Sequence, residues 1–156
     1  MIIDPPEDGW TLELLNQVVY MNGEHITFPI GLDELLENEN YSIEESESIE
    51  GVLELFLHDE FVSVISYELS NKNIHTIMFP NGLYEPDQDF NDYISINGVK
   101  LGIPMTELEK YLGNYDVEEK GVYRFYVRSN TEPRVMDITI APHEEKTALI
   151  MISEVK

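Results

Sequence analysis

Two Asn-Gly dipeptides stand in similar surroundings 75 residues apart, and they constrain the fold more than any other feature of the sequence. The first, Asn22-Gly23, interrupts the strand-like stretch Val18–Pro29, and the second, Asn97-Gly98, interrupts Tyr93–Pro104. Asn-Gly favours the positive backbone angles of a two-residue type I′ turn between antiparallel strands. Each stretch therefore predicts a β-hairpin, and the match between the two predicts an internal repeat.

Residues of the same kind follow each hairpin in the same order. Leu32–Leu36 and Met105–Leu112 read as short helices, and Thr106 can cap the free amides of the second. Three extended stretches come next in each half, namely Val52–Leu57, Phe61–Leu69, Ile74–Phe79, and then Val122–Arg128, Val135–Ala141 and Thr147–Val155. The predicted fold class is α+β, with two tandem repeats, each a β-hairpin, a short helix and a three-stranded antiparallel meander.

The repeat sets the expected domain boundaries. Residues 1–84 form the acidic first α+β repeat, residues 85–90 a polar connector, and residues 91–156 the second α+β repeat. Residues 37–50 and 113–121 lack these patterns and are expected to form irregular loops. The residues expected in the core are Leu35, Leu53, Leu55, Val64, Ile77, Leu101, Leu108, Leu112, Phe125, Ile138, Ile140 and Ile150.

One segment resembles a known type of repeat. Residues 97–113, Asn-Gly-Val-Lys-Leu-Gly-Ile-Pro-Met-Thr-Glu-Leu-Glu-Lys-Tyr-Leu-Gly, are similar to the strand, Leu-Gly-Met-Thr, short helix, Leu-Gly signature of α+β repeats of the β-lactamase inhibitor protein type and of the small lipoprotein of outer-membrane assembly. With Ile26–Pro29 opening the first half, residues 16–156 resemble a group of Firmicutes tandem-repeat proteins of uncharacterised function. The resemblance implies a fold and no chemistry. Members of that group are often exported lipoproteins with a leader and a lipid-bearing cysteine, and this sequence shows neither.

The net charge restricts the expected partners. The 156 residues include 31 acidic and 9 basic side chains, for a formal charge of -22. A surface this negative repels phosphate backbones and anionic lipid headgroups, and no apolar run reaches the roughly 18 residues that a membrane-spanning helix needs. We therefore expect a basic protein as the partner, no nucleic acid and no membrane insertion, while the oligomeric state stays open. The expected location is cytoplasmic for the sequence as it stands, or extracytoplasmic if a leader has been removed.

The sequence lacks the usual motifs of catalysis and cofactor binding. It has no cysteine, Gly-x-Ser-x-Gly elbow, phosphate loop, dinucleotide fingerprint or His-Glu-x-x-His motif. Asp87, Asp89 and Asn91 match the first positions of an EF-hand loop, but Asp92 and Gly98 stand where that loop needs glycine and glutamate. The four histidines share no metal-ligand spacing. The sequence thus predicts a protein that is not an enzyme, with no catalytic residues, no cofactor and no metal site.

Almost all of the negative charge lies in the first part of the chain. Residues 1–99 hold 21 acidic side chains and one basic side chain, Lys72. Two halves of similar plan need the same solubility, so we expect the asymmetry to speed encounter with a cationic partner, with Tyr41 as an anchor. A solvated acidic loop is the alternative interpretation. The predicted partner-binding residues are Glu37, Glu39, Tyr41, Glu44, Glu45, Glu47 and Glu50.

These features favour a non-catalytic protein-binding module, in the form of an acidic immunity or inhibitor protein that neutralises a basic toxin or enzyme. The alternative is an envelope or extracellular assembly or sensing module of the lipoprotein-like family. The first hypothesis rests on the charge distribution, with the resemblance to an inhibitor as an analogy, and the second rests on the resemblance.

Overall fold

The structure, a computed structural model, describes residues 2–80 and 93–155. It is mostly β, with 46% strand, 11% helix and three short α-helices. The strands are β1 (Trp10–Thr11), β2 (Val19–Met21), β3 (Glu24–His25), β4 (Tyr41–Glu45), β5 (Val52–Leu57), β6 (Glu60–Tyr67), β7 (Ile74–Pro80), β8 (Ser95–Ile96), β9 (Val117–Glu119), β10 (Val122–Arg128), β11 (Met136–His143) and β12 (Lys146–Glu154). The helices are α1 (Leu12–Leu15), α2 (Leu32–Leu35), the 3-10 helix η1 (Met105–Glu107) and α3 (Leu108–Leu112).

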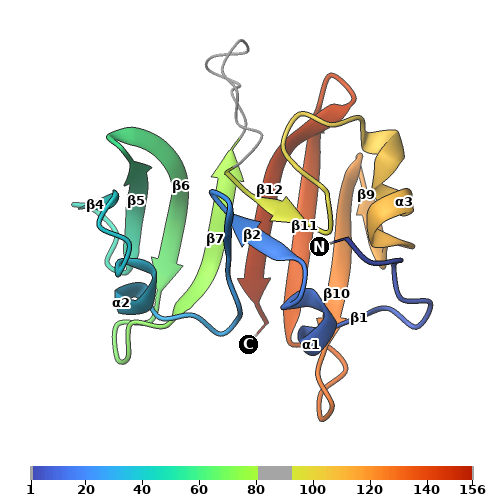
Figure 1. The fold of residues 1–156 in the computed structure, drawn as a ribbon, viewed down its shortest axis with the longest axis horizontal. Coiled ribbons are helices and arrows are strands. Elements are labelled where there is room, and N and C mark those ends of the chain that lie inside the picture. The colour runs from blue at the N-terminus through green and yellow to red at the C-terminus, as the bar shows by residue number, and fades with distance from the viewer. Residues whose placement is uncertain (1, 81–92, 156) are drawn as a thin grey trace.

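Nine of these strands form one large sheet (Figure 1). Its order is β1-β10-β11-β12-β7-β6-β5-β4, and β9 pairs with β10 off this path. Every neighbouring pair is antiparallel except β1 with β10. Strands β7 and β12, the last strands of the two halves of the chain, pair from Thr76 opposite Ser153 to Pro80 opposite Leu149. This pairing makes the sheet continuous across the molecule.

The expected fold class, two α+β repeats, is wrong. The structure is one large mixed sheet with a small three-stranded sheet of order β3-β2-β8, and it does not form a clear α+β repeat. The physical reason is that edge strands have unpaired backbone hydrogen-bonding groups. Strands β7 and β12 pair with each other and satisfy these groups, and β8 pairs with β2 rather than forming a sheet of its own. Strands β4 and β9 also form where irregular loops were expected. The boundaries at 1–84 and 91–156 stay predictions, and the connector at 85–90 and Asp87, Asp89, Asn91 and Asp92 lie outside the described residues.

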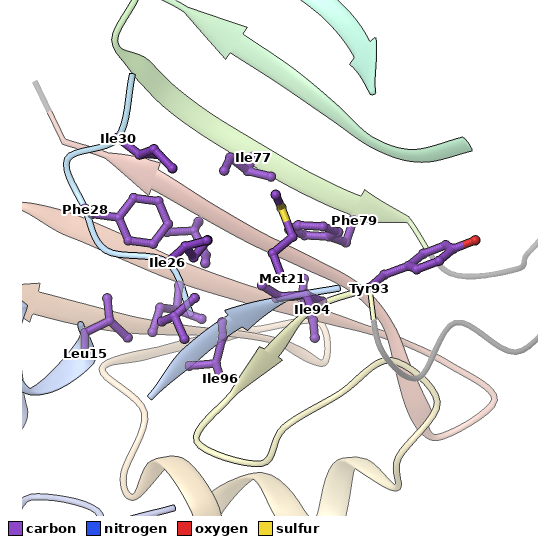
Figure 2. Close-up of a cluster of buried hydrophobic side chains, with 14 of the residues drawn as sticks. Leu15, Met21, Ile26, Phe28, Ile30, Ile77, Phe79, Tyr93, Ile94 and Ile96 are labelled. Atoms are coloured by element: carbon purple, nitrogen blue, oxygen red, sulfur yellow. The ribbon is translucent and has the colours of Figure 1, made fainter. Parts of the chain in front are cut away.

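The core lies between the large sheet and the elements packed on one of its faces. Figure 2 shows Met21 of β2 and the segment after β3, with Ile26, Phe28 and Ile30, on the same face of the sheet as Ile77 and Phe79 of β7. Eleven of the twelve residues expected in the core are buried; the exception, Val64, is half-buried. A bulge in β6 explains the exception, because both Val62 and Ser63 are buried and the later residues of β6 change face.

The local predictions around the second hairpin have different outcomes. Asn97 and Gly98 have φ angles of 49° and 90°, and the amides of Ile96 and Val99 each donate to the other's carbonyl, at 3.0 and 2.9 Å. The two-residue turn is therefore confirmed. The predicted cap is wrong, because Thr106 lies inside η1 and makes no side-chain capping hydrogen bond there. Within the described ranges, no helix is both long and apolar enough to cross a lipid bilayer.

Candidate functional site

The predicted acidic site lies at the β4 end of the large sheet. Its six glutamates, called the acidic edge below, come from the segment after α2, from β4 itself and from the loop between β4 and β5. All six are exposed, and within the described chain none of them forms an ion pair. The members of the acidic edge are Glu37, Glu39, Glu44, Glu45, Glu47 and Glu50.

Strand β4 gives the acidic edge its shape. The strand pairs with β5 from Tyr41 opposite Leu57 to Glu45 opposite Leu53, and it is the terminal strand of the sheet order. Because side chains alternate along a strand, Glu44 and Glu45 point to opposite faces of the sheet. Glu45 accepts a hydrogen bond of 2.7 Å from the Tyr67 hydroxyl, and this bond raises the pKa of Tyr67 above its usual value.

Tyr41, the predicted anchor of this site, is not on the surface. Its side chain is buried, with 8% of its area exposed, and its hydroxyl accepts a hydrogen bond of 2.6 Å from the Asn22 amide. Burial raises the pKa of Tyr41, the bond from Asn22 lowers it, and the negative charge of Glu24 raises it. Tyr41 therefore ties β4 to the first hairpin turn, and the structure offers no exposed Tyr41 ring to a partner. The roles of the six glutamates stay predictions.

Sequence reasoning missed another part of this surface. It is the open face of the large sheet, meaning the face opposite the one that packs on the core. A continuous row of paired residues crosses it on that face: Glu44, Glu54, Val64, Met78, Met151, Thr139 and Arg124. Val64, Met78 and Met151 are half-buried, whereas the covered face holds residues such as Ile65, Ile77 and Ile152 that are at most 1% exposed. Seven strands at roughly 4.8 Å spacing make this row about 30 Å long.

The far end of the open face carries a cation with a partner of its own. The Arg134 guanidinium donates from Nε and Nη2 to the two carboxylate oxygens of Asp137, at 2.8 and 2.5 Å. The same guanidinium lies 4.0 Å from the ring centroid of Tyr126. The hydrogen bonds from Arg134 to Asp137 raise the pKa of Arg134. The open face is thus acidic at β4 and β5, carries Val64, Met78 and Met151 at its centre, and ends at exposed Arg124 of β10 and the Arg134–Asp137 pair.

Among the residues that the structure describes, no group of three or more acidic or histidine side chains is close enough to hold a metal ion. The signal that finds the open face is the strand register, since the methionines Met78 and Met151 are 73 positions apart in the sequence but directly opposite in the sheet. Comparison with family models, curated proteins and solved structures finds no match for the chain.

Proposed function

We propose that the chain is a non-catalytic protein-binding module, of the acidic immunity or inhibitor type, that docks a basic protein. The observation that carries the proposal is the acidic edge, six exposed glutamates without a cationic partner beside a row of half-buried apolar side chains. The resemblance of residues 97–113 to repeats of the β-lactamase inhibitor protein type supports the proposal by analogy.

The two parts of the surface serve different steps of binding. Unpaired surface charge raises the association rate with an oppositely charged protein and orients the encounter. Apolar side chains that become desolvated, such as Met78 and Met151, slow dissociation, because water must return to them when the complex opens. A row about 30 Å long is about as long as the width of an 800 Å² patch, which is one side of a standard protein interface. Docking across the open face therefore fits both the charge and the size.

The experiment measures association with a basic protein captured by the chain from its native source. The test variant combines Glu39→Lys, Glu44→Lys and Glu47→Lys, whose exposed side chains make no hydrogen bond or ion pair within the described residues. The matched control combines Glu119→Lys, Glu132→Lys and Glu145→Lys, which are also exposed and change the net charge equally. Stopped-flow or surface-based kinetics are recorded at low salt and near 1 M salt.

We expect the test variant to lower the association rate roughly 10-fold or more at low ionic strength and the control variant to lower it much less. The difference should nearly vanish near 1 M salt, where the Debye length is about 3 Å. Met78→Asp should raise the dissociation rate instead. A captured partner that is acidic, or association rates that fall equally in both triple variants, would show that the acidic edge is a solvation feature.

A further inference from the structure

A hollow of about 440 Å³ lies at the end of the large sheet opposite the acidic edge. Its walls come from the N-terminal segment, from β1, from the end of α3 with the loop that follows it, and from β10. The volume is within the roughly 300–1,000 Å³ range of small-molecule sites. The hollow shares Tyr126 with the far end of the open face, but none of the six glutamates of the acidic edge lines it.

The lining of this hollow combines acidic and aromatic side chains. Four carboxylates line it, those of Glu7, Asp8, Glu109 and Asp116, and no lysine, arginine or histidine does. Its aromatic lining includes Tyr115, which is 52% exposed, and Tyr126, whose ring already lies 4.0 Å from the Arg134 guanidinium, whereas the buried Trp10 forms part of the floor. Aromatic faces attract cations through their quadrupole, and nearby carboxylates add direct attraction.

The floor of the hollow is held in place by several hydrogen bonds. The Trp10 indole is 2% exposed and donates from Nε1 to the carbonyl of Leu112 at 2.9 Å. The Asp116 carboxylate accepts a bond of 2.7 Å from the backbone amide of Tyr126, and the Tyr115 ring packs edge-on against Tyr123 with centroids 4.9 Å apart. These contacts fix one carboxylate and two aromatic rings before any ligand arrives, which lowers the entropic cost of binding.

A hydrogen-bonded side chain in the second hairpin turn holds the N-terminal wall of the hollow in place. The buried side chain of Asn97 accepts from the amide of Ile3 at 2.8 Å and donates to the carbonyls of Ile3 and Tyr111 at 2.9 and 2.6 Å. Gly113 lies so close to this wall that an added Cβ would sit 3.2 Å from Pro5 Cβ. The segment that carries Glu7 and Asp8 is thus held in place just before these residues, by the bonds from Asn97 to Ile3 and by the close approach of Pro5 to Gly113.

We propose that this hollow binds an organic cation, an ammonium or guanidinium group carried on an aliphatic stem. A stem suits the apolar floor, and the charged head suits the four carboxylates. A metal ion suits the hollow less well, because in the described part of the chain these carboxylates do not converge as a metal-binding group. The cation is either a free amine or a basic side chain presented by another protein.

The test uses the emission of Trp10, which is the chain's only tryptophan and therefore reports this hollow alone. The unmodified full chain is titrated with spermidine, with the capped peptide acetyl-Gly-Arg-Gly-amide, and with the same peptide carrying neutral citrulline in place of arginine. We expect a saturable change in emission below about 10 mM for at least one cation and none for citrulline. Saturation by spermidine alone identifies a free amine, and saturation by the arginine peptide identifies a side chain.

Two variants separate the hollow from the overall charge of the chain. Asp8→Asn combined with Glu109→Gln should lower the affinity for the cation roughly 10-fold at low salt, because it removes two nearby charges while keeping the shape of the side chains. Glu44→Gln combined with Glu47→Gln removes the same charge at the acidic edge and should change the affinity less than 2-fold. Tyr115→Leu should weaken binding about 3-fold through loss of the ring.

Three results would overturn the proposal. They are no saturation by any cation up to about 10 mM, equal binding of the citrulline peptide, and equal weakening by the two carboxylate variants. The first two use the unmodified chain, so they do not depend on how well a variant folds. Failure of the docking surface in its own kinetic test would leave these results unaffected, since that test alters only residues outside the hollow.

Discussion

Replacing Asn97 tests how one buried amide holds the N-terminal segment to the rest of the molecule. Its side chain is fully buried and makes three hydrogen bonds, two with the backbone of Ile3 and one with the carbonyl of Tyr111. It also has a left-handed φ of 49°. A matched position exists in the first hairpin, where Asn22 has a φ of 52° but makes one side-chain bond, to the Tyr41 hydroxyl.

The magnitudes follow from these contacts. Alanine in a left-handed conformation costs about 1 kcal/mol, and each lost hydrogen bond costs about 1 kcal/mol. Asn97→Ala should therefore lower the free energy of unfolding by about 4 kcal/mol, and Asn22→Ala by about 2 kcal/mol. Asn97→Gly removes the backbone strain and should cost about 3 kcal/mol, close to the three bonds alone.

Urea unfolding followed by Trp10 emission and by circular dichroism measures these differences, with unchanged m-values as the check on two-state behaviour. The comparison that decides is between the two alanine variants, because both carry the same backbone strain. If Asn97→Ala costs no more than Asn22→Ala, the buried bonds to Ile3 and Tyr111 do not stabilise the fold. Asn97→Gly should also lower the affinity of the hollow for the proposed cation, because it releases Ile3, which lies just before the N-terminal wall of the hollow.

Three further variants test the local structure. Ser63→Ala should raise the free energy of unfolding by about 1 kcal/mol, because the fully buried hydroxyl has no hydrogen-bond partner within the described residues. Gly113→Ala should lower it by about 1–2 kcal/mol and shift Trp10 emission, since its φ is 78° and its added Cβ would press on Pro5. Tyr41 has a raised pKa in the folded state, so its contribution is complete below the unfolded value near 10 and is lost as pH rises through that value toward the folded one. The stability advantage of the unmodified chain over Tyr41→Phe should therefore shrink above about pH 10 in urea titrations, and a constant advantage would contradict burial of Tyr41.

The strands with strong alternation could be predicted from the sequence, and the weak ones could not. The six predicted extended stretches all overlap observed strands, β5, β6, β7, β10, β11 and β12. Strands β4 and β9 were expected as loops because glutamate has low strand propensity. In the structure they pair with β5 and β10, whose own strand signal is strong. Pairing with a neighbouring strand thus compensates for the low strand propensity of β4 and β9.

Pairing between distant strands is the part of the fold that the sequence does not encode locally. Nothing in the pattern of Ile74–Phe79 or Thr147–Val155 indicates that β7 and β12 pair with each other rather than end two separate sheets. The sequence also gives no sign of the bulge at Val62 and Ser63, because Val62 and Val64 alternate as in a regular strand. Both features depend on which backbone groups and which faces find partners in the assembled sheet.

The charge count by sequence half shows why the candidate sites were only partly predictable. The acidic edge is continuous in sequence and was found from its glutamates, although the burial of Tyr41 depends on a contact with the distant Asn22. The hollow takes Glu7 and Asp8 from the acidic half and Glu109 and Asp116 from the nearly neutral half. A count along the chain therefore hides it, because folding brings carboxylates of both halves to one place, while no lysine or arginine lines the hollow and Arg134 lies beside its Tyr126 ring. The two surfaces lie at opposite ends of the sheet, so charge changes at one should alter binding at the other only through screened, long-range interactions.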